Sequence, residues 1–287
     1  MGELTGCIDL HLHTTASDGT DTPAQLVEKA AALGLAAIAV TDHDTVAGLP
    51  EAAQAGTRYG VEVIAGIELS TDYRDNNVHV LGYFLDPDAA ALRSALDWAR
   101  REFAERNAKM IAMLASDGFD ISLEALEAEY PGAVLARPHM AEHLVKKGYA
   151  DSIEDAFDRY LGVGRKYFLP RRRIPLAEAI AAIRASGGLA SLAHPLQYGY
   201  PPDEVTTMIA CARDGGVGAL ECIYSGYTSE QMRWLLDRAA EYGLAVSGGS
   251  DCHGARKRHI SLGCGTGELA IPYEVLRRLK ERAAQKE

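Results

Sequence analysis

The chain has 287 residues, of which 47% are hydrophobic, a composition that fits a globular protein with a large buried core. Its 40 acidic residues outnumber the 29 basic ones and give a net charge of −11, which argues against binding of long nucleic acids through general phosphate contacts. No apolar run approaches the roughly 20 residues that span a bilayer, and the amino terminus lacks the pattern of a signal peptide, so we expect a cytoplasmic protein that binds no membrane.

Short apolar runs alternate with helical patterns along most of the chain. The runs that predict strands are 7–10, 36–41, 61–67, 78–84, 189–193, 218–223, 244–247 and 260–264. The patterns that predict helices between them are 23–33, 46–59, 176–185, 203–213, 229–242 and 273–284. This alternation is typical of βα units around a parallel sheet, and the number of units favours a closed or distorted (β/α) barrel over an open sheet.

The alternation breaks between residues 87 and 170, where the sequence becomes helical and charged. The predicted helices of this segment are 92–114, 123–129, 138–147 and 153–160. We interpret residues 87–170 as an inserted helical subdomain that helps to form the substrate pocket, and residues 1–86 and 171–287 as the barrel. Five basic residues lie within 165–173; they are either a solvated loop or a rim that faces phosphate.

Histidines and acidic residues follow most of the predicted strands. His11 and His13 are two residues apart, so on a strand they leave the same face, which is a spacing suited to chelation. In a barrel the carboxyl ends of the strands converge on one face. We therefore predict a polynuclear metal site. Its candidate ligands are His11, His13, Asp18, His43, Glu68, His79, His194, Asp251 and His253.

These residues occur within motifs that resemble the PHP (polymerase and histidinol phosphatase) family. The motifs are His11-x-His13, Ser17-Asp18-Gly19, Thr41-Asp42-His43-Asp44, Gly66-x-Glu68, His79, Ala193-His194-Pro195 and Gly249-Ser250-Asp251-x-His253-Gly254. The resemblance implies an α/β fold, a distorted (β/α)7 barrel, with two or three divalent ions. It assigns His11, His13, Glu68 and Asp251 to one ion, Glu68, His79 and His194 to a second, and Asp18, His43 and His253 to a third. Imidazole and carboxylate ligands suit Mn, which we favour, as well as Zn or Fe.

The helical insertion, with its segment 136–141, resembles the TrpH-like or YciV-like subgroup of the family. That subgroup includes phosphatases of nucleoside 3',5'-bisphosphates and enzymes that trim short oligonucleotides or RNA 5' ends. The resemblance implies a hydrolase that removes a phosphate, most readily the 3'-phosphate of a nucleoside 3',5'-bisphosphate, by means of a metal-bridging hydroxide. His194, His253 and Asp251 are the expected catalytic residues, and His194 or His253 is expected to help protonate the leaving oxygen.

A bisphosphate needs a second recognition point beyond the metal ions. Arg137 is the first candidate, because a guanidinium offers a planar fork of donors to phosphate oxygens; the alternative is a surface residue that caps the next helix. His139 lies beside it. Arg171 and Lys257 are weaker candidates for phosphate contacts, and Tyr198 is a candidate for stacking on a base, although structural packing explains a tyrosine equally well.

Three other functions remain open from the sequence. A small-metabolite phosphatase of the histidinol-phosphate type would use the same metal ligands, but the insertion and Arg137 argue against it. A non-catalytic metal-binding module is opposed by the complete set of ligands. A processive exonuclease is opposed by the acidic net charge, although a nucleotide or a short oligonucleotide remains a suitable substrate.

Overall fold

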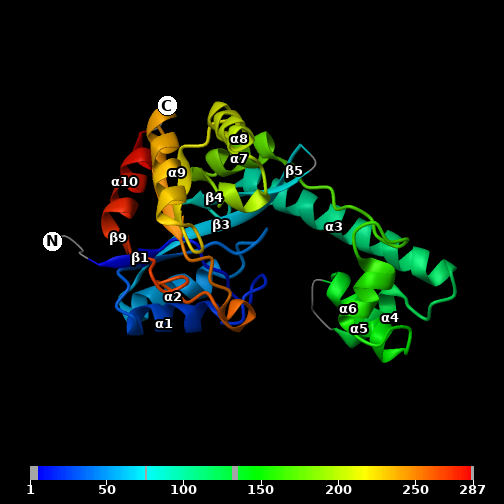
Figure 1. The fold of residues 1–287 in the computed structure, drawn as a ribbon. Coiled ribbons are helices and arrows are strands. Elements are labelled where there is room, and N and C mark those ends of the chain that lie inside the picture. The colour runs from blue at the N-terminus through cyan, green and yellow to red at the C-terminus, as the bar shows by residue number, and fades with distance from the viewer. Residues whose placement is uncertain (1–5, 75, 131–134, 286–287) are drawn as a thin grey trace. The chain divides into compact units, whose positions relative to one another are not determined.

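The computed structural model describes residues 6–74, 76–130 and 135–285. The chain divides into two compact units, of which the first comprises Met1–Leu96 and Ile174–Glu287 and the second Asp97–Arg173. The boundary between the units falls within the sequence of the long helix α3 (Ala90–Ser116), which is labelled in Figure 1. Its buried residues Leu92 and Leu96 belong to the first unit. The helical unit therefore begins later in the chain than the predicted insertion. Within the described residues no helix combines the length and the hydropathy needed to cross a membrane.

The first unit is built on one sheet. Its strands are β1 (Cys7–Asp9), β2 (Ala37–Val40), β3 (Glu62–Tyr73), β4 (Asn76–Tyr83), β5 (Ile174–Pro175), β6 (Leu189–Leu192), β7 (Ala219–Tyr224), β8 (Ala245–Gly249) and β9 (Ile271–Pro272). Their order is β8-β7-β6-β4-β3-β2-β1-β9, and β5 pairs with β3. Neighbours pair in parallel, except that β4 runs antiparallel to β3 and β6, and β9 runs antiparallel to β1.

The two ends of this sheet meet between β1 and β8. The Leu10 amide donates to the carbonyl oxygen of Gly248 at 3.3 Å, and the Asp251 amide donates to that of His11 at 2.9 Å. Gly249 permits this approach, since a Cβ there would lie 2.3 Å from the His11 Cβ. Seven of the described strands, β1, β2, β3, β4, β6, β7 and β8, thus form a nearly closed ring, which confirms the predicted distorted (β/α) barrel.

Helices cover the strands of the first unit. They are α1 (Pro23–Ala32), α2 (Leu49–Tyr59), α7 (Leu176–Ala185), α8 (Pro202–Asp214), α9 (Ser229–Glu241) and α10 (Tyr273–Ala284), with short 3₁₀ turns at η2 (Pro195–Tyr198) and η3 (Gly254–Lys257). Helix α1 begins where Thr22 accepts from the Gln25 amide in a capping box, followed by Pro23 in the first turn. Helices α1 and α2 pack side by side (Figure 1).

The apolar core of the first unit joins the sheet to α10. Ile8 of β1, Leu81 of β4 and Ile271 of β9 belong to one buried cluster with Leu276 and Leu279 of α10. Burying such aliphatic side chains contributes roughly 1.5–3 kcal/mol each. Helix α10 therefore ties together strands that lie far apart in the sequence.

The second unit has a core of its own. Besides the later part of α3 it contains α4 (Leu123–Glu129), α5 (Arg137–Lys146) and α6 (Ile153–Ala156), which continues as the π-helix η1 (Phe157–Leu161). Met110, Leu114, Leu126, Met140 and Leu144 are all fully buried in this cluster. The helices predicted at 92–114, 123–129, 138–147 and 153–160 are each present, with ends that differ by a few residues.

Three details of the predicted barrel are wrong. β3 continues to Tyr73 and pairs with β4 as an antiparallel hairpin, because no helix separates the two strands. Residues 260–264 form turns with a single bridge between Ser261 and Gly265, since Gly263 and Gly265 both adopt positive φ (76° and 58°). The sequence analysis missed β5 and β9, because two residues are too short to show an apolar pattern.

Candidate metal centre

All nine predicted metal ligands lie in the barrel unit, where the parallel strands end. His11 and His13 follow β1, His43 follows β2, and His194 follows β6. Asp251 and His253 follow β8, and Asp18 lies in the loop after the first two histidines. Glu68 and His79 differ, because they lie within the long hairpin strands β3 and β4. The barrel thus brings together residues from six strands or strand ends.

The carboxylate of Glu68 lies at the centre of five imidazoles. Its Oε2 is 3.2 Å from Nε2 of both His11 and His13 and 3.1 Å from Nδ1 of His43, and its Oε1 is 2.9 Å from Nδ1 of His79 and 2.9 Å from Nε2 of His194. Glu68 is fully buried. The two oxygens of Glu68 thus face different imidazoles.

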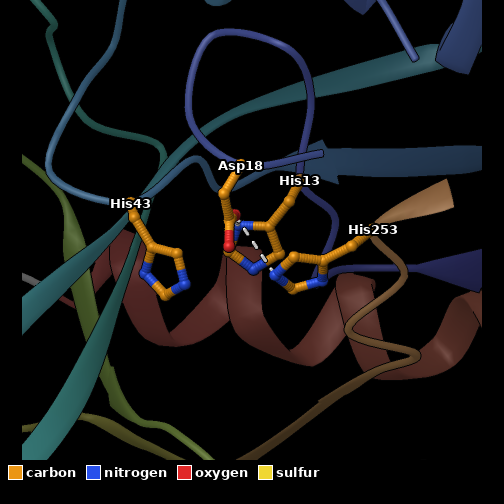
Figure 2. Close-up of side chains that lie close together, drawn as sticks. All are labelled: His13, Asp18, His43 and His253. Atoms are coloured by element: carbon orange, nitrogen blue, oxygen red, sulfur yellow. Dashed lines mark ion pairs between the residues drawn. The ribbon is translucent and has the colours of Figure 1, made fainter. Parts of the chain in front are cut away.

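A second group surrounds Asp18. The Asp18 Oδ1 lies 3.2 Å from Nε2 of His253 and 3.8 Å from Nδ1 of His13. Figure 2 shows the rings of His13 and His253 close to this carboxylate, with His43 beside them, and the dashed line joins Asp18 to His253. One ligand atom from each of these four residues lies within 4.8 Å of the others.

Other ligand atoms come equally close in three further groups. They are His11, His13 and Asp251; His11, Glu68 and His194; and His43, Glu68 and His79. These groups share members, so they describe one continuous cluster. The grouping places His13 also beside Asp18, whereas the family resemblance assigned His13 and Asp18 to different ions.

Several buried nitrogen and oxygen atoms of the cluster have no hydrogen-bond partner in the described structure, and this bears on whether the cluster suits metal ions. They include His11 Nε2, both ring nitrogens of His13, His43 Nδ1, His194 Nδ1 and Glu68 Oε2. A buried polar atom without a partner costs about 1–3 kcal/mol, so this concentration is unfavourable for a protein without ligands. Divalent cations accept such imidazole and carboxylate donors directly. The residues therefore fit divalent metal ions.

The charges within the cluster hold its acids in the ionised form. Burial raises the pKa of Glu68, but the imidazoles of His43, His79 and His11 outweigh burial and hold that pKa well below its usual range. Burial lowers the pKa of His13, but Asp251 and Glu68 outweigh it and raise the pKa to about 9. The carboxylates thus attract positive charge into the site, and a bound cation must displace protons from imidazoles.

Glu221, within β7, supports two of the candidate ligands. The Nδ1 of His11 donates to Glu221 Oε1 at 2.9 Å, and the backbone amide of His194 donates to Glu221 Oε2 at 2.7 Å. In the neutral ring, a proton held on Nδ1 by Glu221 leaves Nε2, the atom that faces Glu68, free to bind a cation. Glu221 is fully buried. From the sequence alone we expect for Glu221 at most a supporting role behind the ligands, and its two hydrogen bonds are of that kind.

The two oxygens of Asp251 have different surroundings. Oδ1 lies 3.2 Å from Nε2 of His13, whereas Oδ2 accepts from the Tyr224 hydroxyl at 2.7 Å and from Lys257 Nζ at 2.8 Å. Tyr224 and Lys257 therefore hold one oxygen and leave the other directed at the imidazoles. Lys257, a candidate for phosphate contact, makes its polar contact with this carboxylate.

Asp42 holds the loop that carries Asp18. It accepts from the Thr14 amide at 2.7 Å, the Thr14 hydroxyl at 2.7 Å and the Ser17 hydroxyl at 2.6 Å. Asp42 is not among the predicted ligands, although it follows β2 and directly precedes His43. These contacts hold Thr14 and Ser17, and Ser17 directly precedes Asp18.

Positive φ angles occur at three residues of this region. Five non-glycine residues of the described chain have positive φ; among them His194 (23°) and Asp251 (59°) are candidate ligands, and Asp44 (52°) directly follows the candidate ligand His43. Such conformations cost about 1–3 kcal/mol and persist where the surrounding structure holds them. The backbone is thus strained where it presents candidate ligands.

The candidate substrate residues, unlike the candidate metal ligands, do not all lie in the barrel unit. Tyr198 joins two strands, since its hydroxyl accepts from the His79 amide at 2.8 Å and donates to the Ala193 carbonyl at 3.0 Å. Arg137, His139 and Arg171 belong to the helical unit. The Arg137 guanidinium lies over the rings of Phe157 and Phe168 at 5.6 and 5.2 Å and donates to the Leu161 carbonyl. His139 Nδ1 accepts from the Ala136 amide at the start of α5, and Arg171 lies over Phe103 at 5.2 Å.

Comparison with known proteins identifies the fold and its relatives. The PHP domain model matches residues 9–178. A 5'-3' exoribonuclease of Haemophilus influenzae is 34% identical over 250 residues, which are 87% of this chain and 91% of the relative. A 3',5'-nucleoside bisphosphate phosphatase of Chromobacterium violaceum is 32% identical over 250 residues, 86% of this chain and 87% of the relative.

A solved structure agrees with these relatives. A protein of Bifidobacterium adolescentis, described as a candidate metal-dependent phosphoesterase, is 33% identical and superposes with a TM-score of 0.77 over 96% of each chain. The similarity thus extends through the helical unit as well as the barrel. Since the family model covers more than half of the chain and these relatives align along most of it, the protein is a member of the PHP domain family.

Proposed function

We propose that the protein hydrolyses phosphate esters of nucleotides and acts best on the 3'-phosphate of nucleoside 3',5'-bisphosphates. The observation that carries this proposal is the ring of buried imidazoles around Glu68, with its unpartnered nitrogen atoms. Membership of the PHP family supports the reaction class. The named activity of the Chromobacterium violaceum relative supports the substrate.

The divalent ions would be held by the nine residues of the cluster. Glu68 would be shared between ions, with His11, His13, His43, His79 and His194 around it and Asp18, Asp251 and His253 completing the set. We favour two or three Mn ions over Zn or Fe. When bound, the ions supply Lewis acidity, activation of the attacking water and neutralisation of phosphate charge.

Proton transfer to the leaving oxygen is assigned to His194. Nδ1 of His253 donates to the Asp251 carbonyl at 2.9 Å and its Nε2 faces Asp18, so both of its nitrogens are engaged. His194 has Nε2 facing Glu68, while its Nδ1 has no hydrogen-bond partner. We therefore favour His194 for this role, with its Nε2 as the atom that would bind an ion and its Nδ1 as the atom that would carry the proton.

Recognition of the second phosphate is assigned to Arg137 of the helical unit. Burial, together with the positive charges of Arg137, Arg171 and Arg173, lowers the pKa of Arg106 to about 10. This crowding of guanidinium groups favours an anion among them. Phe157 and Phe168 restrict the Arg137 side chain, so less entropy is lost when it binds phosphate. His139 begins the same helix and is a weaker candidate.

Phosphate release by the Mn-loaded protein tests the proposal. We expect adenosine 3',5'-bisphosphate to be converted to 5'-AMP and phosphate much faster than 5'-AMP, 3'-AMP or histidinol phosphate is hydrolysed. Preference for histidinol phosphate would overturn the substrate and favour the small-metabolite alternative. No turnover of any ester, with metal bound, would favour a non-catalytic module.

A second candidate activity is the removal of nucleotides from the 5' end of short RNA. The Haemophilus influenzae relative, named a 5'-3' exoribonuclease, is as similar to this chain as the phosphatase is. Five-nucleotide RNAs with and without a 5'-phosphate distinguish the two activities. Stepwise release of 5'-mononucleotides would establish trimming, whereas turnover of adenosine 3',5'-bisphosphate without release of nucleotides from either RNA would limit the enzyme to bisphosphates.

A further inference from the structure

A cavity of about 790 Å³ lies in the barrel unit at the end opposite the candidate metal ligands. Its lining residues are found where α7, α8 and α10 end and where β6, β7 and β8 begin. His194 and Asp251 follow the other ends of β6 and β8, so the length of these strands, about 15 Å, separates the cavity from the metal cluster. A volume of this size is typical of small-molecule sites.

Three arginines from three helices line this cavity. Arg184, Arg213 and Arg282 lie in the last turns of α7, α8 and α10, and none of the described lining residues is acidic. Arg213 pairs with Asp214 at 2.8 Å, whereas Arg184 and Arg282 form no ion pair within the described chain. In a protein with a net charge of −11, this cavity is a local concentration of positive charge.

The arginine side chains are held in place by their packing. Arg184 lies across Gly216, where φ is 98° and a Cβ would come within 2.3 Å of the Arg184 Nη1. Arg282 Nε is 3.7 Å from the position of a Cβ at Gly218, and Arg213 stacks on Tyr242 at 5.5 Å. Two guanidinium groups thus lie against the same three-residue segment, and less entropy is lost when an anion binds between them.

The helix dipoles explain part of this pattern. A cation in the last turn of a helix is favourable by typically 0.3–1 kcal/mol, which accounts for an arginine at any one of these positions. It does not account for three of them around one cavity, where their charges repel one another. An anion in the cavity removes this repulsion.

We propose that this cavity binds a small anion that carries a diphosphate group. Two linked phosphates offer enough oxygen atoms for several guanidinium groups, each of which can bind phosphate through two parallel hydrogen bonds. The site is separate from the metal cluster, so its ligand does not compete with the substrate. The proposal does not depend on the reaction that the metal cluster catalyses.

Titration calorimetry of the intact protein, with Mn kept in excess over the probe, tests the site with inorganic pyrophosphate and with ADP. The test variant is Arg184→Gln combined with Arg282→Gln. The control is Arg58→Gln, which removes one arginine charge, against two in the test variant, from the last turn of α2 without touching the cavity. We expect wild type, Arg58→Gln and Asp251→Ala to bind the probe, and the double variant to bind at least tenfold more weakly at this site.

Hydrogen exchange locates the binding. We expect slower amide exchange at residues 216–219 and in the last turn of α10, next to the mark C in Figure 1. If ADP bound tightly and pyrophosphate did not, the ligand would be a nucleotide. If pyrophosphate bound as tightly as ADP, the diphosphate group itself would be what the site recognises. The proposed site would be overturned if the double variant bound the probe as tightly as the wild type. It would also be overturned if Arg58→Gln lost as much affinity as the double variant, or if only the residues around the metal ligands were protected.

Discussion

Glu221 and His11 are 210 residues apart in the sequence and are joined by a hydrogen bond of 2.9 Å between two fully buried side chains. The bond fixes which nitrogen of His11 is protonated, and the second oxygen of Glu221 holds the backbone of His194. A single carboxylate therefore orients two candidate ligands of the metal cluster. Residues of this kind affect metal affinity without touching the metal.

We predict that Glu221→Gln lowers metal affinity by about 10–100-fold, because the amide cannot accept from both the His11 ring and the His194 backbone. Metal content after dialysis against a limiting chelator, measured by elemental analysis, checks this. Glu230→Gln changes an exposed glutamate in the first turn of α9 and should retain the metal. Full metal content in Glu221→Gln would show that the ligands are oriented without this carboxylate.

Asp251→Ala should abolish hydrolysis while the protein stays folded. The substitution removes an oxygen directed at His13, and it also leaves Tyr224 and Lys257 without their shared acceptor. Turnover of adenosine 3',5'-bisphosphate and far-ultraviolet circular dichroism together check the prediction. Lys257→Met is the comparison, because this substitution removes one partner of the Asp251 Oδ2 and leaves the carboxylate in place. Lys257→Met should reduce activity less than Asp251→Ala does. Measurable turnover by a folded Asp251→Ala protein would contradict a ligand role for Asp251.

Arg137→Ala should weaken substrates with two phosphates more than substrates with one. The loss of a charge-assisted contact to phosphate corresponds to about 1.5–3 kcal/mol, or a factor of roughly 10–100 in kcat/KM. The ratio of kcat/KM for adenosine 3',5'-bisphosphate to that for 3'-AMP is the measurement. Arg159→Ala, an exposed arginine of the same unit that pairs with Asp155, is the control. An equal decrease for both substrates would remove Arg137 from the second-phosphate role.

Removal of metal should lower the melting temperature. Ions that bind the folded protein alone stabilise it by about 2.7 kcal/mol at a concentration 100-fold above Kd, which corresponds to roughly 4–5 °C for a chain of this size. Scanning calorimetry with and without chelator checks the shift, and adding back Mn should restore it. An unchanged melting temperature after verified metal loss would argue that the buried imidazoles around Glu68 do not need ions for stability.

Local patterns in the sequence were enough to predict the barrel and most of its helices. Thr22 and Pro23 predict the start of α1, and the structure has the expected capping box there. His11 and His13 have a spacing that places them on one face of an extended segment, and both rings do face Glu68. In these cases the relevant contacts lie within a few residues, where side-chain periodicity determines direction.

Contacts between distant segments could not be predicted in the same way. The bonds of Glu221 to His11 and of Tyr224 to Asp251 depend on the curvature of the sheet, which no local pattern encodes. The antiparallel β3–β4 hairpin was missed for a related reason, since both strands are apolar enough to resemble parallel ones. The sequence therefore predicts which residues are candidates for the site and leaves their supporting contacts to the folded structure.

The closure of the barrel offers a last prediction, at Gly249. Because a Cβ at this position would lie 2.3 Å from the His11 Cβ and 2.4 Å from its backbone nitrogen, Gly249→Ala must push β8 away from the segment that carries His11. Overpacking of this kind costs about 1–3 kcal/mol, and here it also displaces a candidate ligand. We expect a lower free energy of unfolding in urea together with lower metal content. Gly215→Ala, where the nearest atom to a Cβ lies at 3.3 Å, should change stability less and leave metal binding intact. If Gly249→Ala were destabilised but kept the metal content of the wild type, the contact between β8 and the His11 segment would not be needed to place the ligands.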